Sequence, residues 1–312
     1  MLRAVIFILF ALHAHGYPAW FEDYVVEHAK QYTAEQAMQA YEILKPKYDH
    51  IRKNDSDLLL RLHSFSDRHR HSRRLRRTAS RTTLQQQSFA MPLNFDWRTH
   101  GAVSTPRAQG SCGGCYCFAG VASLEYWYHK KTGVLKDFSV QQCLDCTHQY
   151  IPDSDGCDGG LMEDLYELTK RRPLGFDSAD RYKRHDSACV YSDHGIKVKS
   201  YHSIDDEFGG HAEQQLASNL VQYGPIPVGI DSRSLNMELY RDGIIRASHC
   251  TREIDHAVTV VGYNTTGTTR YWIIKNSWGK YWGQQGYFYL ERDVNACGID
   301  SYASFVTDAA LV

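Results

Sequence analysis

The sequence predicts an α+β fold for most of its 312 residues. Two observations support this prediction. Apolar residues recur at helical spacing up to about residue 171, whereas short β-rich runs dominate after about residue 201. Helices and strands that are segregated along the chain are typical of α+β folds. With 43% hydrophobic residues, the chain is long enough for a large core in one or two domains.

Residues 1–16 have the features of a secretory signal peptide. Arg3 provides a positive start, residues 4–12 form an apolar core, and Ala14 and Gly16 provide small residues around a cleavage point. The apolar run is far shorter than the roughly 20 residues that a membrane span needs. We therefore expect a chain that enters the secretory pathway and has no membrane span.

The charge distribution sets residues 17–89 apart from the rest of the chain. This stretch has 13 Lys and Arg against 9 Asp and Glu, and residues 90–312 have 21 against 27. A basic segment ahead of an acidic domain fits a segment that lies on that domain. The net charge of the whole chain is −1, so nothing in the charge balance indicates a nucleic-acid partner.

Most of residues 22–62 have a helix-forming pattern, in which Pro46 should kink or interrupt the helix. The arginine-rich run 73–77 is either a solvated linker or a processing site. We expect cleavage near Arg77 and trimming towards residues 91–93, since exposed polar linkers are preferred cleavage sites. Asn54 and Asn264 begin glycosylation sequons.

Further helices and strands are expected in order after residue 90. A helix should start at Cys115 and end at Gly133, where two lysines and a glycine provide a C-terminal signal. Two more helices are expected at about 139–146 and 161–171. Strands are expected at 256–263, 270–275 and 286–291.

The run from Gln109 to Phe118, QGSCGGCYCF, carries the strongest chemical signal. It places Cys115 after two glycines at a helix N-terminus, where unpaired N–H groups and partial positive charge favour a reactive thiolate. His256 follows 141 residues later and Asn276 follows 161 residues later. This is the order of a Cys-His-Asn nucleophilic triad.

At these residues the chain resembles the papain family of cysteine proteases, and its pattern is cathepsin L-like. The run from Leu93 to Arg98 resembles the start of the mature family domain, and the run from Asn276 to Tyr287 resembles its Asn motif. The resemblance implies a papain-like α+β fold of a helical lobe and a β-barrel-like lobe with a cleft between them. It also implies a signal peptide (1–16), an inhibitory helical pro-segment (17–90) and a peptidase domain (91–312).

The resemblance assigns roles to five residues. Cys115 would be the nucleophile and His256 would exchange its proton. Asn276 would orient the imidazole, and Trp278 would cover that hydrogen bond. The Gln109 side chain and the Cys115 backbone N–H would bind the oxyanion, where loss of one donor typically costs roughly 10²–10³ in rate.

The resemblance also implies a substrate-binding strip and a pocket for the side chain two residues before the cut. The implied residues are Gly159, Gly160, Leu161, Met162, Gly229, Ile254, Ala257 and Tyr302. Tyr302 is larger than the small residue usual in cathepsin L, so we expect a hydrophobic preference with a shortened pocket. Tyr116 stands where the family usually has Trp.

Nine cysteines in a secreted chain indicate disulfides and one odd thiol. The resemblance implies the pairs Cys112–Cys157, Cys146–Cys189 and Cys250–Cys297. It matches neither Cys117 nor Cys143, which form either a fourth bridge or two buried thiols. A zinc site at the two CxxC pairs is disfavoured because 27 residues separate them, against the usual roughly 15–20. We expect no metal and no cofactor.

The resulting hypothesis is a secreted or lysosomal cysteine endopeptidase that acts through a thioester acyl-enzyme and is made as an inactive precursor. Its implied partners are protein or peptide substrates, its own pro-segment and cystatin-like inhibitors, and we expect a monomer. Two alternatives stay open at this stage. One is a catalytically silent binding homologue, and the other is a peptide ligase in which an amine replaces water.

Overall fold

A computed structural model describes residues 17–18, 21, 34–53, 58–60, 91–205, 212–233 and 237–312. The chain divides into two compact units. The first comprises residues 1–70 with 236–241, and the second comprises residues 71–235 and 242–312. Each unit is described by itself. The signal sequence, the arginine-rich run 73–77 and the Asn54 sequon lie outside the described residues.

The first unit contains helix α3 (Ala34–Lys53) and strand β1 (Leu58–Leu60). The expectation that Pro46 interrupts the helix is wrong, because α3 continues through it. Proline removes one backbone hydrogen bond, but its fixed φ is compatible with a helix. The buried residues Ala37, Ala40 and Leu44 lie at helical spacing in the preceding turns. Burial of this stripe favours the helix over the local preference of the proline.

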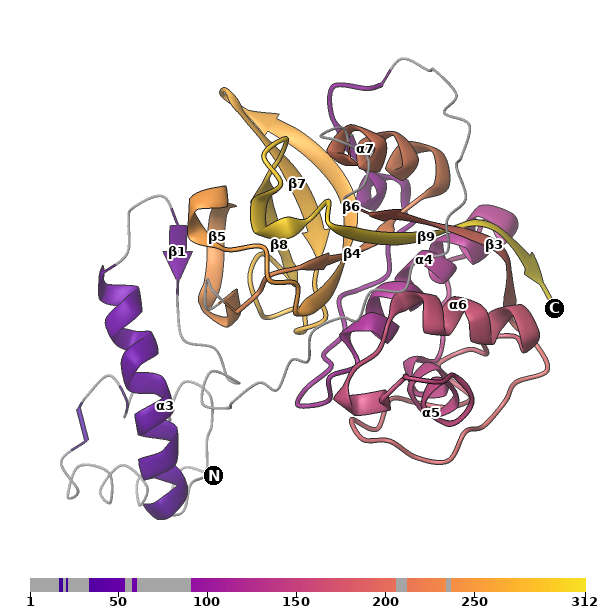
Figure 1. Ribbon diagram of the computed structural model, residues 1–312, viewed down its shortest axis with the longest axis horizontal. Coiled ribbons are helices and arrows are strands. Elements are labelled where there is room, and N and C mark those ends of the chain that lie inside the picture. Colours follow the sequence, from indigo (N-terminus) through magenta and orange to yellow (C-terminus); the bar gives the residue numbers. More distant parts are fainter. Residues whose placement is uncertain are drawn as a thin grey trace. The chain divides into compact units, whose positions relative to one another are not determined.

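The second unit combines a helical half with a strand-rich half. Its helices are α4 (Cys115–Thr132), α5 (Val140–Tyr150), α6 (Met162–Arg171) and α7 (Ala212–Tyr223). Its strands are β2 (Phe95–Asp96), β3 (Ile196–Asp205), β4 (Ile226–Ile230), β5 (Tyr240–Ile245, of which residues 242–245 belong to this unit), β6 (His256–Thr266), β7 (Thr269–Lys275), β8 (Tyr287–Glu291) and β9 (Tyr302–Leu311). We call residues 112–195 the helical half and the sheet with α7 the strand-rich half (Figure 1).

The sheet of the second unit runs in the order β5-β8-β7-β6-β4-β9-β3, and β2 also pairs with β6. Its pairs are antiparallel except for the parallel pair β5–β8. The β4–β6 register places Gly229 opposite Ala257 and Ile230 opposite His256. Val228 in the same strand pairs with Ala303 of β9, so Tyr302 lies close to this part of the sheet.

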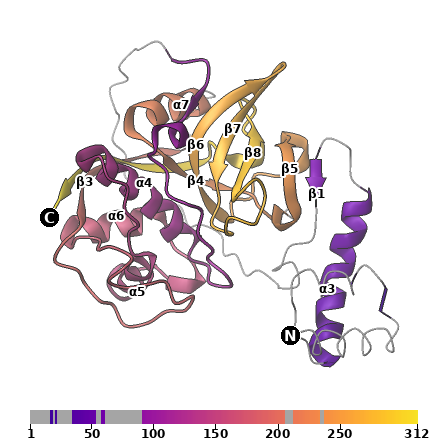
Figure 2. The same cartoon turned by 180° about the vertical axis from the view of Figure 1, so that it is seen from behind.

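Helix α4 is the central element of the helical half and contacts α5, α6 and strand β6 (Figures 1 and 2). Thirteen of its residues, from Cys115 to Trp127, are buried without interruption. Its C-terminus matches the prediction, because Gly133 has a φ of 73° and donates its N–H to His129 at 2.8 Å. A helix that is buried all round belongs to a core, and α4 therefore provides a rigid base for the residues at its N-terminus.

Six elements of the strand-rich half were not predicted individually: strands β2, β3, β4, β5 and β9 and helix α7. Helix α7 was missed, although Ala212, Leu216 and Leu220 recur every four residues and are buried. Strand β9 was also missed, although it pairs with β3 over its whole length. Its sequence lacks the alternation of apolar and polar residues that marks a half-exposed strand, because most of β9 is buried.

The structure contains four disulfides: Cys112–Cys157, Cys117–Cys143, Cys146–Cys189 and Cys250–Cys297. The Cys117–Cys143 bridge resolves the alternative that the sequence left open and joins α4 to α5. The remaining cysteine, Cys115, is a buried thiol. Because three of the four CxxC cysteines are in disulfides, these pairs do not form a zinc site.

Candidate active site

Cys115 is the first residue of α4 and follows a turn that requires glycine. A Cβ atom on Gly113 would lie 2.6 Å from the Cys157 carbonyl oxygen, which also accepts the Gly113 N–H at 2.6 Å. This close approach holds the turn against the 112–157 disulfide. The first N–H groups of a helix, which include that of Cys115, have no acceptor within the helix itself.

His256 is the first residue of β6, on the other half of the unit. The backbone N–H of the next residue, Ala257, donates to the Cys115 Sγ atom at 3.4 Å. Through this contact the thiol of the helical half lies against the first residues of strand β6. Both side chains are nearly buried, with 9% of Cys115 and 3% of His256 exposed.

Asn276 follows the last residue of β7 and orients the imidazole. Its Oδ1 atom lies 2.8 Å from Nε2 of His256 and also accepts the Ser277 N–H at 2.8 Å. An amide oxygen can only accept, so Nε2 carries a hydrogen and Nδ1 is the nitrogen that can exchange a proton. The Trp278 ring stacks on the imidazole at 4.9 Å between centroids.

Gln109 is held by contacts that fix both ends of its side-chain amide. Its Nε2 donates to the Cys112 carbonyl at 2.8 Å, and its Oε1 accepts the Ser277 hydroxyl at 2.5 Å. Its backbone N–H donates to the Ser277 carbonyl at 2.8 Å. Because Nε2 has two hydrogens, one can be directed to a ligand. Sequence reasoning missed Ser277, although it directly follows Asn276.

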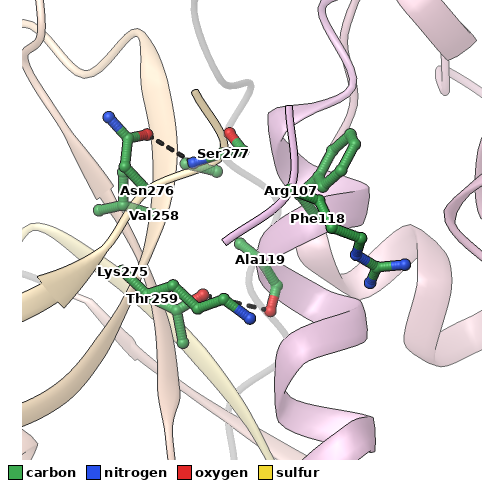
Figure 3. A pocket seen from close by; sticks show the side chains of 9 residues that line it. Arg107, Phe118, Ala119, Val258, Thr259, Lys275, Asn276 and Ser277 are labelled. Carbon is green, nitrogen blue, oxygen red and sulfur yellow. Dashed lines mark hydrogen bonds between the residues drawn. The ribbon is translucent and has the colours of Figure 1, made fainter. Parts of the chain in front are cut away.

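A pocket lies between the first turns of α4 and the strands β6 and β7 (Figure 3). Phe118 and Ala119 line it from α4, and Asn276 lines it from the end of β7. It therefore lies where the helical and strand-rich halves meet, next to the residues described above. Arg107, Ala257, Val258, Thr259, Lys275 and Ser277 complete its lining.

A buried ionic cluster joins the two halves beside this pocket. Glu125 of α4 accepts hydrogen bonds from Ser104 and, at 2.7 Å, from Arg107. The Lys275 ammonium donates to the Ser104 hydroxyl at 2.7 Å and lies 4.0 Å from Glu125. Burial lowers the pKa of Lys275 to about 8, against the opposing attraction of Glu125. Buried charges need partners, and here the Glu125 carboxylate is the partner of both the Arg107 guanidinium and the Lys275 ammonium.

The predicted substrate strip follows the 112–157 disulfide and leads into α6. Gly159 has a φ of 125°, and a Cβ on Gly160 would lie 2.7 Å from the Tyr116 ring. Tyr116 itself is fully buried, and its hydroxyl lies 3.1 Å from that of Thr147. The large ring of Tyr116, the residue after Cys115, therefore requires a residue without a side chain at position 160.

Most of the predicted pocket residues lie around one buried cluster. Met162, Ala257 and Tyr302 belong to it, and Gly229 pairs with Ala257 across strands β4 and β6. Leu161 is half-buried and packs against this cluster. The Tyr302 hydroxyl donates to the Glu163 carboxylate at the start of α6, a contact that the sequence did not predict.

Ile254 stands apart from that cluster, since it is half-buried and its Cδ1 atom lies against Gly298. Asn264, the second glycosylation candidate, is half-buried near the end of β6, where its Oδ1 accepts the Thr265 N–H at 2.7 Å.

Across the described ranges, no group of three or more His, Cys, Asp or Glu side chains could hold a metal ion. Among the helices in the part of the chain that the structure describes, none is both long and apolar enough to cross a membrane.

Comparisons with known proteins agree with this arrangement. Residues 91–307 match the papain family cysteine protease domain. Cathepsin S of Rattus norvegicus is 35% identical over 228 residues, which cover 72% of this chain and 68% of the relative. Cathepsin L of Sarcophaga peregrina is 35% identical over 231 residues, which cover 72% and 67%.

Solved structures give the same result over a longer stretch. The digestive procathepsin L2 proteinase from the larval midgut of Tenebrio molitor superimposes with a TM-score of 0.81 at 26% identity, and the match covers 93% of this chain and 99% of that one. Procathepsin L 3 of the same source has a TM-score of 0.78 at 25% identity and covers 92% and 98%. The chain therefore belongs to the papain family and is a cysteine-type peptidase.

Proposed function

We propose that the protein is an endopeptidase that cleaves peptide bonds through Cys115, His256 and Asn276, with Gln109 as an oxyanion donor. The observation that carries the proposal is the contact between the two halves of the unit. The N–H beside His256 donates to the Cys115 sulfur at 3.4 Å, while the imidazole is held by Asn276 at 2.8 Å. Nucleophile, base and orienting group are thus assembled in one place.

The reaction follows from these positions. The Cys115 thiolate attacks the carbonyl carbon of the substrate, and the carbonyl oxygen becomes an oxyanion bound by the Cys115 N–H and Gln109 Nε2–H. Collapse of this intermediate breaks the C–N bond, and Nδ1–H of His256 protonates the leaving amine. Nδ1 then takes a proton from water, whose oxygen attacks the thioester. The products are a carboxylic acid and the regenerated thiol.

Substrate selection is proposed to occur beside Leu161 and Met162. An extended substrate backbone would lie along Gly159 and Gly160, because the absence of side chains allows a close approach. The pocket for the residue two before the cut would be formed by Gly229, Ile254, Ala257, Met162 and Tyr302. Its apolar walls and the bulk of Tyr302 favour short hydrophobic side chains, and a preference for arginine in a panel of dipeptidyl substrates would contradict this.

We further propose that the chain is made as an inactive precursor with a signal peptide (1–16) and an inhibitory pro-segment (17–90). The likeness to procathepsins supports this, because it covers 93% of the chain, a share that residues 91–312 alone cannot provide. The proposed activating cut lies near Arg77, and the proposed place of action is the lysosome or the extracellular space. N-terminal sequencing of the acid-treated protein tests the cut.

The primary test is covalent labelling of the acid-treated protein with an epoxide probe for cysteine proteases, alongside Cys115→Ala. We expect one probe molecule per chain in the parent and none in the variant, because alkylation needs an accessible thiolate. Hydrolysis of a dipeptidyl amide reporter should disappear in the same variant. Processed protein that neither takes up the probe nor cleaves the reporter would overturn the proposal in favour of a silent homologue.

A further inference from the structure

The backbone of Gln109 is held from the helical half by Tyr182. The Tyr182 hydroxyl donates to the Gln109 carbonyl oxygen at 2.7 Å. Its ring packs edge-on against Phe118, one turn after Cys115, with 5.0 Å between centroids. Burial raises the pKa of Tyr182 above its ordinary value, so the hydroxyl keeps the hydrogen that it donates.

The turn beside this contact also approaches Arg184. Gly110, which follows Gln109, has a φ of 66°, and a Cβ there would lie 3.2 Å from Cδ of Arg184. Tyr182 and Arg184 therefore both lie near the turn that carries Gln109.

The segment that contains Tyr182 has no strand or helix of its own, and buried side chains of α5 hold its backbone. Oε1 of Gln141 accepts the Lys183 N–H at 2.7 Å, and Nε2 of Gln141 donates to the His185 carbonyl at 2.9 Å. Asp145 accepts the Ser187 N–H at 2.7 Å. Gln141 and Asp145 are buried, so water does not compete for these bonds.

Two disulfides connect this support to the active-site helix. Cys146–Cys189 anchors the end of the segment to α5, and Cys117–Cys143 anchors α5 to the first turn of α4. A continuous set of contacts thus runs from α4 through α5 to Tyr182 and on to the backbone of Gln109.

Ser277 holds Gln109 from the opposite side. It binds the Gln109 backbone N–H and the side-chain Oε1. Ser277 belongs to the strand-rich half, whereas Tyr182 belongs to the helical half. The direction of the Gln109 side chain therefore depends on both contacts, because its Cα–Cβ bond is fixed only when the peptide units on either side are fixed.

We propose that Tyr182 is a positioning residue that aims the Gln109 amide at the substrate oxyanion. The inference rests on the proposed role of Gln109. A small displacement of a preorganised donor weakens the binding of the transition state more than the binding of the substrate. The reason is that the negative charge on oxygen develops only during the reaction. Tyr182 should therefore affect kcat and leave KM unchanged.

The test compares Tyr182→Phe with Tyr263→Phe in the processed protein. Tyr263 is a matched control, since its hydroxyl also donates to a backbone carbonyl, that of Pro92, at 2.8 Å. Three quantities are measured: the kinetics on a dipeptidyl amide, the inhibition constant of a peptide aldehyde, and the rate of alkylation by iodoacetamide. The aldehyde adduct places an oxygen in the oxyanion site, whereas alkylation by iodoacetamide forms no oxyanion.

We expect Tyr182→Phe to lower kcat by about 3- to 10-fold, the range for one hydrogen bond, with KM unchanged. The aldehyde should bind more weakly by the same factor, and the alkylation rate should stay at the parent value. Tyr263→Phe should change none of the three. An equal loss of alkylation rate and aldehyde affinity would overturn the inference, because it would place the effect on the thiol or on the fold.

A double variant separates this inference from the function on which it rests. In a Gln109→Ala background, Tyr182→Phe should have no further effect on kcat or on aldehyde affinity, since both changes act through one donor. Additive losses would show that Tyr182 acts elsewhere. If Gln109→Ala alone leaves aldehyde affinity intact, the proposed role of Gln109 is wrong. If it lowers the affinity and Tyr182→Phe does not, only the inference is wrong.

Discussion

The backbone of the helical half and the backbone of the strand-rich half of the second unit are held in different ways. In the strand-rich half, the ladders of β3 to β9 pair the backbone, and one disulfide, Cys250–Cys297, is present. In the helical half, long connections such as 172–195 have few regular partners. There, three disulfides and the buried side chains of α5 take the place of a ladder.

The difference shows what a buried polar residue does in each half. Gln142 of α5 is buried and donates to the Pro173 carbonyl at 2.8 Å, while its oxygen accepts the Gly175 N–H at 2.8 Å. It thus acts as the partner strand that this connection lacks, because buried backbone groups need hydrogen bonds. The proposed active site lies where the two halves meet, with Cys115 on the helical half and His256 on the strand-rich half.

The largest loss of activity is expected when either His256 or Cys115, which lie on different halves of the unit, is replaced. His256→Ala should lower kcat by about 10⁴-fold or more, as should Cys115→Ala, since nucleophile and base act as a unit. The double variant should be no worse than either single variant. Reporter hydrolysis with active-site titration measures this. Multiplicative losses in the double variant would show that the two residues do not share one step.

The next effect concerns the ionic cluster that joins the halves. Glu125→Ala should lower the free energy of unfolding by about 3–5 kcal/mol, because it leaves the partly buried Arg107 and the buried Lys275 without their carboxylate. Urea unfolding monitored by tryptophan fluorescence measures the loss. Asp308→Ala is the control, since its pair with Lys131 lies at the surface and such pairs contribute about 0–1 kcal/mol. Equal losses would contradict the role assigned to the cluster.

Removing the disulfide between α4 and α5 tests how far the helical half depends on its disulfides. Cys117→Ala with Cys143→Ala should cost about 3 kcal/mol on the chain-entropy argument for a closed loop of this size. The helical half should then be cleaved first in limited proteolysis, within 172–195. Cys250→Ala with Cys297→Ala should cost at least as much in urea, since it closes a longer loop, but the ladders should protect its surroundings. Cleavage at the same sites in both variants would contradict the difference in support between the two halves.

The smallest expected effect is a pH dependence of the free energy of unfolding, which comes from Asp164 at the start of α6. Burial raises the pKa of Asp164 to about 6 from an ordinary value of 3.8, and a bond from the Leu161 N–H opposes this only in part. The folded state therefore binds the proton more readily than the unfolded state. The stability that this provides is present below about pH 4 and is lost as the pH rises towards 6.

Asp164→Asn removes this titration and keeps an oxygen for the Leu161 N–H. Between pH 4 and pH 7, the parent should lose about 1–3 kcal/mol of unfolding free energy relative to the variant. Unfolding in urea at four pH values measures the difference. Parallel curves for parent and variant would show that the carboxyl titrates normally in the folded protein.

Local signals in the sequence were sufficient for much of the fold. The glycine turn before Cys115 and the cations before Gly133 predicted α4 within a residue at each end. The β-rich runs predicted β6, β7 and β8 with errors of up to three residues. Helix α7 and strand β9 were missed, since the first carries a weak apolar stripe and the second is buried on both sides.

The sequence by itself determined the family, the α+β class and the order of the reactive residues, because these depend on motifs and on local hydrophobic patterns. Only the tertiary structure decided whether Cys117 meets Cys143, that α3 continues through Pro46, and that Ser277 and Tyr182 hold Gln109 from opposite sides. The physical reason is distance along the chain. Tyr182 lies 73 residues from Gln109 and Ser277 lies 168 residues from it, so each hydrogen bond exists only after segments far apart in the chain have packed together.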